Sequence, residues 1–386
     1  MPRKSTRIIH AAGGARGPAV PVNPPVVRAS TVLFDKLGTW RDYRARREHE
    51  RLLTYGARGT DTAFALERAL ADLEGGYRTQ LFPTGLAAIA GVFMAYLKPG
   101  DHLLLTDAVY GPVRRLCEEY LRANGVSYEY YAADGSDLEA RVRNETRMIY
   151  VECPGSLVYE MIDLPRVARL AKARGILVAV DNTWGSGWLY NPLALGADVS
   201  VIAVTKYIGG HSDIMMGAVV TTEAAWRPVG RTADTMGFTA SPDDAYLALR
   251  GLRTLGARME LHQRNALAVV DWLASRAEVR EIFFPALPSH PGHDIWKRDC
   301  SGVNGLVSFE LARGTAADME RMIDRLELFG IGASWGGFES VVLPADVVAS
   351  RTVTDWSGRN AIVRLHIGLE DPRDLIEDLE RGFAAL

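Results

Sequence analysis

Cysteine and lysine are scarce in this chain, and their scarcity excludes several kinds of site. Among its 386 residues are three cysteines, Cys117, Cys153 and Cys300, which are far apart and form no CxxC pair. This pattern argues against a disulfide framework or a structural zinc site, so we expect free thiols in a reducing compartment and no metal. The formal charge of −3 gives no reason to expect nucleic acid or an anionic membrane as a partner.

Long apolar runs are also missing. The longest, residues 86–97, is too short to span a bilayer. The first four residues, MPRK, are not followed by the apolar segment of a secretory signal. We therefore expect a cytoplasmic protein. Hydrophobic residues make up 48% of the chain, which is enough for a core that folds without a metal.

Residues 1–60 are expected to form an irregular arm. Prolines at positions 18, 21, 24 and 25 interrupt any helix, and residues 41–51 are a dense run of charge. The apolar pieces at 26–27 and 32–34 argue against a merely solvated tail. We expect the arm to pack on a neighbouring subunit.

The pattern changes at residue 61 to helices alternating with short apolar strands. Such alternation predicts an α/β fold with a mostly parallel sheet that is covered on both faces. We expect a large domain at 61–240 and a smaller α/β domain at 241–386, which opens with a long helix at 243–275. Strands of the large domain are predicted at 79–82, 102–105, 126–131, 148–151, 176–180 and 199–204, and those of the small domain at 279–284, 306–311 and 362–367.

Polar residues follow three of these strands. Lys206 comes after the strand at 199–204, Asp181 after that at 176–180, and Gly85 begins a helix after that at 79–82. Each has an ordinary interpretation alone: a surface lysine, a helix cap and a turn. Open α/β sheets, however, bind ligands at the carboxyl edge of their strands, where these three residues meet.

The chemistry that needs this set is catalysis with pyridoxal phosphate (PLP). A lysine must form an imine with the cofactor aldehyde, and only six lysines are present to supply it. Lys206 can serve, with Asp181 keeping the pyridine nitrogen protonated. The helix start at Gly85 and Leu86 can bind the phosphate, and Thr205 can add a hydroxyl. Tyr110, just past the strand at 102–105, is placed to cover the ring.

Several longer motifs, in order along nearly the whole chain, make a resemblance recognisable. The sequence resembles the Cys/Met-metabolism family of fold-type I PLP enzymes, and within it the bacterial cystathionine β-lyases. The motifs are VNPP at 22–25 with RAS at 28–30, LEGG at 73–76, DNTW at 181–184, AVTKY at 203–207, GHSD at 210–213, GLRTLG at 251–256, SWGG at 334–337 and RLHIGLED at 364–371.

This resemblance implies further roles. Arg364 would bind the substrate α-carboxylate through its planar guanidinium. Ser334 and Trp335 would line the substrate pocket, although core packing is the ordinary interpretation of Trp335. Tyr110 would also accept a proton from the substrate amine. A homotetramer is implied, built from dimers that share active sites.

One segment departs from the family pattern. Relatives carry Tyr-x-Arg, donated across the dimer interface to the neighbour's phosphate, whereas this chain has Tyr55-Gly56-Ala57-Arg58. Tyr55 matches the tyrosine of this pattern, so the resemblance implies that it binds the neighbour's cofactor. Ala57 occupies the expected arginine position, and Arg58 lies one residue late. Arg58 is expected to bind the neighbour's phosphate in place of that arginine, from a different direction.

The activity expected is α,β-elimination from a sulfur amino acid. With L-cystathionine the products would be homocysteine, pyruvate and ammonia. Three alternatives stay open: another substrate such as cystine or a cysteine S-conjugate, γ-elimination or γ-substitution on the same scaffold, and a PLP-binding protein without lyase activity. Trp335 argues mildly against γ-chemistry, and Lys206, Asp181 and Arg364 together argue against an inactive protein.

Overall fold

The fold is described from a computed structural model, which covers residues 2–11 and 18–386. Its main element is a seven-stranded sheet with the order β1-β7-β6-β5-β4-β2-β3. Strands β2 to β6 run parallel to one another, and β7 is antiparallel to both β1 and β6. The strands are β1 (Arg78–Phe82), β2 (His102–Thr106), β3 (Ser127–Tyr131), β4 (Thr146–Glu152), β5 (Leu177–Asp181), β6 (Val199–Ala203) and β7 (Gly217–Thr221).

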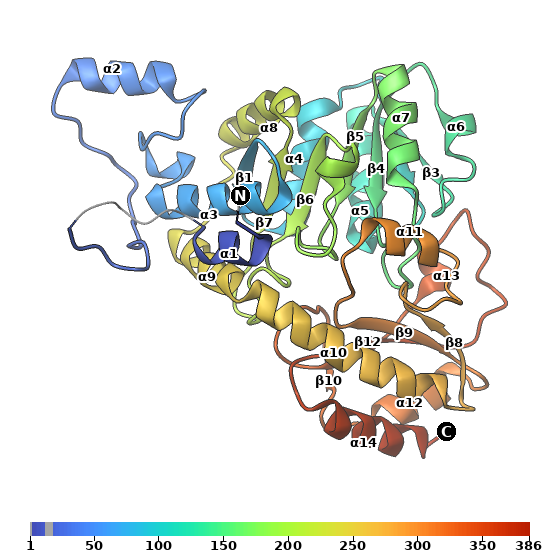
Figure 1. The fold of residues 1–386 in the computed structure, drawn as a ribbon. Coiled ribbons are helices and arrows are strands. Elements are labelled where there is room, and N and C mark those ends of the chain that lie inside the picture. Colours follow the sequence, from blue (N-terminus) through green and yellow to red (C-terminus); the bar gives the residue numbers. More distant parts are fainter. Residues whose placement is uncertain (1, 12–17) are drawn as a thin grey trace.

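Helices cover both faces of this sheet (Figure 1). Neighbouring residues of β6 show why: Val201 packs into one hydrophobic cluster and Ile202 into another, as alternation along a strand requires. The predicted α/β class with a mostly parallel sheet covered on both faces is therefore confirmed. The helices of this region are α3 (Asp61–Glu74), α4 (Gly85–Tyr96), α5 (Gly111–Leu116), α6 (Leu138–Arg141), α7 (Leu164–Arg174) and α8 (Glu223–Met236), with short turns η2 (Cys117–Leu121), η3 (Arg122–Asn124) and η4 (Pro192–Leu195).

A second, five-stranded sheet lies nearer the C-terminus, in the order β10-β11-β12-β9-β8. All its pairs are antiparallel except β10 with β11. The domain boundaries at 60 and 240 stay predictions. The elements are α9 (Pro242–Arg253), α10 (Leu255–Ala274), β8 (Val279–Phe283), α11 (His293–Asp299), β9 (Leu306–Leu311), α12 (Ala316–Ile323), β10 (Gly330–Ile331), β11 (Val341–Pro344), α13 (Val347–Ser350), β12 (Ile362–His366) and α14 (Pro372–Phe383).

The predicted helix at 243–275 is divided in the structure. Thr254 separates α9 from α10 with φ −101° and ψ 4°. Arg258 explains the break, because its guanidinium donates to the carbonyl of Gly251 at 2.8 Å. Gly251 is needed there, since a Cβ would lie 2.3 Å from the carbonyl oxygen of Gly209.

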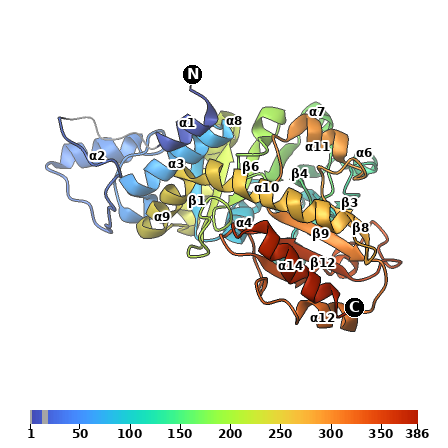
Figure 2. The same ribbon diagram turned by 60° about the horizontal axis from the view of Figure 1, so that its bottom comes forward.

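The prediction that residues 1–60 form an irregular arm is wrong in part. These residues include α1 (Lys4–Ile9), α2 (Leu37–Arg46) and the turn η1 (Gly56–Arg58). The charge run favours α2 because Arg46 pairs with Asp42 and Glu50 at helical spacing. No residue of α2 is buried, and in both views it stands away from the sheets, far from α14 (Figure 1, Figure 2). None of the helices in the described ranges is long and apolar enough to cross a membrane.

A buried carboxylate connects the two sheet regions. Asp107, just past β2, accepts hydrogen bonds from Arg114 at 2.7 Å and from the backbone N–H groups of Thr352, Val353 and Thr354 at 2.9–3.2 Å. Burial alone raises the pKa of this carboxyl, but these donors outweigh it and the pKa is lowered. Asp107 therefore fixes the segment after α13 against the end of β2.

Asp107→Asn should lower the free energy of unfolding by about 3 kcal/mol at neutral pH, because an amide N–H would face buried donors. A folded-state pKa below the unfolded one adds stability above about pH 4 that is lost as the pH falls through the folded pKa. The wild-type protein should thus approach the variant in acid. Urea unfolding at pH 7 and at about pH 2 measures this. Asp72→Asn, which breaks the exposed pair with Arg7 at 3.6 Å, is the matched control and should change nothing.

Candidate active site

Lys206 lies in the turn that follows β6, and the turn is held from several sides. The N–H of Gly210 donates to the carbonyl of Lys206, and that of Lys206 to Ala203, at 2.8 and 3.1 Å. Arg258 of α10 donates to the carbonyl of Tyr207 at 2.7 Å. The backbone at Lys206 is therefore fixed by α10 as well as by the sheet.

The Lys206 side chain reaches the loop at 334–337. Its Nζ donates to the Ser334 hydroxyl at 2.5 Å and lies 5.2 Å from the centre of the Trp335 ring. Burial, helped by the positive charge of Arg364, lowers the pKa of Lys206 to about 8. Far more of this amine is thus uncharged near neutral pH than of an ordinary lysine, as a nucleophilic lysine requires.

Asp181, at the end of β5, is 8% exposed. Its Oδ1 accepts from the N–H and hydroxyl of Thr183 at 2.9 and 2.6 Å, and the same hydroxyl accepts from the N–H of Ala203. Its Oδ2 has only a long contact of 3.4 Å with the Tyr150 hydroxyl. Burial raises the pKa of Asp181, although the bonds from Thr183 oppose it. One carboxylate oxygen is therefore free to accept a short bond from a ligand N–H.

Tyr110 lies near this carboxylate, at the start of α5. Its backbone N–H donates to Oε2 of Glu152 at 2.6 Å, and Glu152 faces Asp181 across the β4–β5 pair. Burial first, and the charge of Asp181 next, raise the pKa of Glu152 well above its usual value. With one of the pair protonated, Asp181 is free to carry the negative charge. The Tyr110 ring is 46% exposed and is available to cover a planar ligand.

The start of α4 offers donors to an anion. Thr84 caps the helix by accepting from the N–H of Ala87 at 3.0 Å, while the N–H groups of Gly85 and Leu86 have no acceptor within the described ranges. A Cβ on Gly85 would lie 2.8 Å from that of Ala203, so the helix start packs directly on the end of β6. Unpaired N–H groups here are a ready site for a phosphate.

Thr205 and Arg364 are placed differently with respect to ligands. The Thr205 hydroxyl donates to the carbonyl of Met216 at 3.2 Å and accepts from its N–H at 3.0 Å. Its binding to phosphate stays a prediction. Arg364 on β12 makes no ion pair among the residues that the structure describes, and its side chain donates one long hydrogen bond, to the carbonyl of Ser334 at 3.5 Å. Its guanidinium is therefore available to a carboxylate.

The structure brings Lys206, Asp181, Tyr110, Ser334, Trp335 and Arg364 into one region but shows no contact between them and Tyr55 or Arg58. Tyr55, 52% exposed, lines a separate pocket of about 470 Å³ with Arg28 and Ser30. The Arg58 guanidinium pairs with Asp234 of α8 in its own chain. Roles for Tyr55 and Arg58 at a neighbour's site stay predictions.

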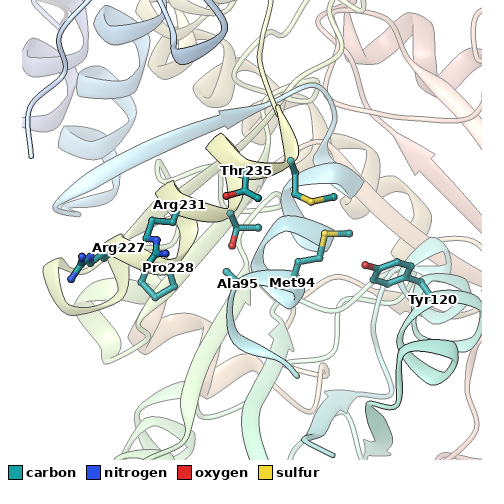
Figure 3. A pocket seen from close by; sticks show the side chains of 9 residues that line it. Met94, Ala95, Tyr120, Arg227, Pro228, Arg231 and Thr235 are labelled. Carbon is teal, nitrogen blue, oxygen red and sulfur yellow. The ribbon is translucent and has the colours of Figure 1, made fainter. Parts of the chain in front are cut away.

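A second pocket, of about 510 Å³, is lined by Met94 and Ala95 of α4, by Arg227 and Arg231 of α8, and by Tyr120 (Figure 3). None of the predicted site residues lines it. Candidate residues were thus found from strand ends and motifs rather than from the size of a cavity.

Three residues of the site were given no role by the sequence. Glu152 ends β4 just past the predicted strand, so extending the strand-end argument by one residue would have found it. Thr183 lies within the DNTW motif and His366 within the RLHIGLED motif. Only the hydrogen bonds show that Thr183 binds Asp181 and that His366 binds Gly336.

The residues present fit PLP. Lys206 has a lowered pKa, Asp181 a free oxygen for a pyridine N–H, and α4 two unpaired N–H groups for a phosphate. These three features lie on β5, the turn after β6, and the helix that packs against β6. Their chemistry matches the three functional groups of the cofactor: the aldehyde, the pyridine nitrogen and the phosphate.

Comparison with known proteins agrees with this. A family model for Cys/Met metabolism PLP-dependent enzymes matches residues 5–384. A cystathionine beta-lyase from Bordetella avium is 49% identical over 94% of this chain and 92% of its own length. An L-alanine/L-glutamate racemase from Wolbachia pipientis wMel is 36% identical over 95% and 93%. The crystal structure of metB from Corynebacterium glutamicum has a TM-score of 0.91 and 31% identity, covering 100% of this chain and 98% of that one.

The reactivity of Lys206 should rise with pH around its lowered pKa. In protein freed of cofactor, modification of Lys206 by trinitrobenzenesulfonate, followed by peptide mapping, should have a midpoint near pH 8, compared with the ordinary value of 10.5. Arg364→Met removes a nearby positive charge and should move the midpoint upward, while burial keeps it below 10.5. Arg373→Met, at an exposed site on α14, should leave it in place. A midpoint near 10.5 in the wild-type protein would contradict the buried position of the amine.

Proposed function

We propose a specific reaction for this chain, which belongs to the Cys/Met metabolism PLP-dependent enzymes. It is a carbon–sulfur lyase that acts on L-cystathionine or a related S-substituted cysteine. With cystathionine and water, it gives homocysteine, pyruvate and ammonia. The observation that carries this proposal is the half-buried amine of Lys206, held by Ser334 beside the unpaired Arg364.

Lys206 is proposed to hold the cofactor and to move the substrate proton. PLP supplies an aldehyde that reacts with amines and a ring that accepts the electron pair released at the substrate Cα. The Nζ of Lys206, once freed, takes the Cα proton and can return a proton to the departing sulfur, because its pKa of about 8 suits both directions near neutrality. Asp181 accepts the ring N–H through its free Oδ2.

Arg364 and Tyr110 are proposed to orient the substrate. Two N–H groups of the Arg364 guanidinium can donate side by side to the α-carboxylate of the substrate. No carboxylate among the described residues already occupies this guanidinium. Tyr110 covers the cofactor ring. Burial, with Glu152 and Asp181 next in effect, raises the pKa of its phenol. It therefore stays protonated until a neighbouring positive charge lowers that pKa. Ser334 and Trp335 are proposed to line the substrate pocket beside Lys206.

The N-terminal arm, residues 1–60, is proposed to pack on a second copy of the chain. Leu33 is 91% and Val22 90% exposed, and large apolar side chains so exposed favour an interface. Tyr55 would then reach the neighbour's cofactor. We propose a homotetramer of such dimers in the cytoplasm, with no nucleic-acid or membrane partner.

Racemisation at the substrate Cα is the second candidate function. A relative that is 36% identical to this chain is named an L-alanine/L-glutamate racemase. Racemisation exchanges the Cα proton and cleaves no carbon–sulfur bond. The proposed lysine is equally suited to that step, so the products must decide. Cystine, cysteine S-conjugates and γ-eliminating substrates belong in the same assay panel.

Lys206→Ala should keep the fold and lose nearly all turnover, because it removes both the attachment and the proton carrier. Wild-type protein with PLP should release pyruvate from L-cystathionine, measured by coupled lactate dehydrogenase. Borohydride reduction and peptide mapping should place the pyridoxyl group on Lys206. Lys172→Ala, on α7, is the control. A pyridoxyl group on another lysine, or loss of alanine chirality without pyruvate, contradicts the proposal.

Ala57→Arg should tighten PLP retention, because Ala57 is exposed at the place where relatives carry the arginine that binds the neighbour's phosphate. Arg58→Ala should change retention little, since the Asp234 pair holds Arg58 to α8 of its own chain. Retention is measured by absorbance after dialysis. Asp234→Asn is the control that frees Arg58 without removing it. If Arg58→Ala releases cofactor instead, Arg58 replaces the missing arginine. If neither variant has an effect, the segment does not touch the phosphate.

A further inference from the structure

The loop at 334–337 contacts Lys206 through both its side chains and its backbone. Ser334 accepts from Nζ, and Trp335 lies 5.2 Å from it. Gly336 packs on the lysine backbone so closely that a Cβ would lie 3.1 Å from the Cα of Lys206. The position of the reactive amine therefore depends on the position of this loop.

The backbone conformation of this loop is unfavourable at Ser334 and needs contacts from outside the loop. Ser334 has φ +107°, a region that residues other than glycine rarely adopt, and Gly336 has φ +88°. Such strain persists only where surrounding contacts fix it. Some group outside the loop must therefore keep Ser334 against Lys206.

His366 of β12 provides that contact. Its Nε2 lies 3.1 Å from the backbone N of Gly336, and its Nδ1 lies 3.1 Å from the carbonyl oxygen of Glu339. A carbonyl can only accept and an N–H can only donate, so Nδ1 carries the hydrogen and Nε2 is the acceptor. One uncharged imidazole, 1% exposed, thus binds both sides of the segment.

We propose that His366 is a positioning residue, whose uncharged ring fixes the 334–337 loop through Gly336 and Glu339 and thereby sets Ser334 and Trp335 against Lys206. It acts through the loop and touches neither the lysine nor the proposed substrate site. The consequence for turnover rests on the proposed function; the fixing of the loop does not.

The surroundings keep the ring uncharged. Burial lowers the pKa of His366 well below its usual value, and His262, Arg364 and Lys206 oppose protonation further. A second ring N–H would face the N–H of Gly336 and remove its acceptor. The N–H of Gly336 would then be a buried donor without a partner, which is unfavourable and would release the loop.

His262 offers a matched control in the same cluster. Its ring centre is 5.2 Å from that of His366, and its Nδ1 binds the carbonyl of Ile367 at 2.8 Å. Its Nε2 is buried without a partner among the described residues. Asparagine keeps a donor near Nδ1 and deletes Nε2, so His366→Asn and His262→Asn make the same change, but only the first removes a hydrogen bond.

The experiment measures hydrogen exchange of the peptide spanning 334–340 by mass spectrometry in the PLP-loaded enzyme, together with kcat and KM for L-cystathionine. His366→Asn should speed exchange about 10-fold or more and lower kcat about 10–100-fold with the cofactor absorbance retained. His262→Asn should match the wild-type protein in both. His366→Gln, whose amide oxygen can reach the Nε2 position, should restore slow exchange.

Equal effects of the two asparagine variants would show a general packing defect and overturn the proposal, as would wild-type exchange in His366→Asn. If His366→Asn does not fold, His366→Gln decides alone: fast exchange at 334–340 in that variant overturns the proposal. Absence of lyase activity in the wild-type enzyme would refute the proposed function while leaving the exchange result to decide the role of His366.

Discussion

A lysine amine must be uncharged to act as a nucleophile, and the enclosure that lowers the pKa of Lys206 is the constraint on which the rest of the site depends. The turn after β6 places the amine between the large sheet and the 334–337 loop, and burial does most of the work. That enclosure exists only while the two sheet regions stay together. Contacts that hold the turn, such as that of Arg258 with the carbonyl of Tyr207, therefore also bear on the chemistry of the amine.

The acidic residues of the site follow the opposite logic. Burial raises the pKa of both Asp181 and Glu152, and two adjacent carboxylates cannot both be charged without cost. Thr183 gives its two hydrogen bonds to Asp181 alone, which favours the charge there. A protonated ring nitrogen against Oδ2 would favour it further. Within the described ranges, the Glu152 carboxyl accepts a single hydrogen bond, from the N–H of Tyr110, so the two bonds from Thr183 favour the charge on Asp181.

Much of this could be predicted from the sequence, because strands and their ends are local features. The strand before Lys206 and that before Asp181 were both expected within a residue of their observed ends. Strand β7 was missed, since it lacks its own alternating pattern and is recognised only by its partners β1 and β6. The helix α2 was missed because its ion pairs, rather than an apolar face, favour it. His366 could not be assigned a role, since its partners lie about 30 residues away in the chain.

The connection between the sheets explains how residues from distant segments meet at one amine. Asp107 lies three residues before Tyr110, and its carboxylate binds the segment at 352–354, which leads into β12. The contact of Asp107 with this segment therefore fixes Tyr110 and Arg364 relative to each other, although neither residue takes part in it. His366, two residues beyond Arg364, extends the same strand's influence to the loop beside Lys206. Strand β12 thus places both the proposed carboxylate contact and the wall of the site, which makes the small sheet a direct part of the catalytic arrangement.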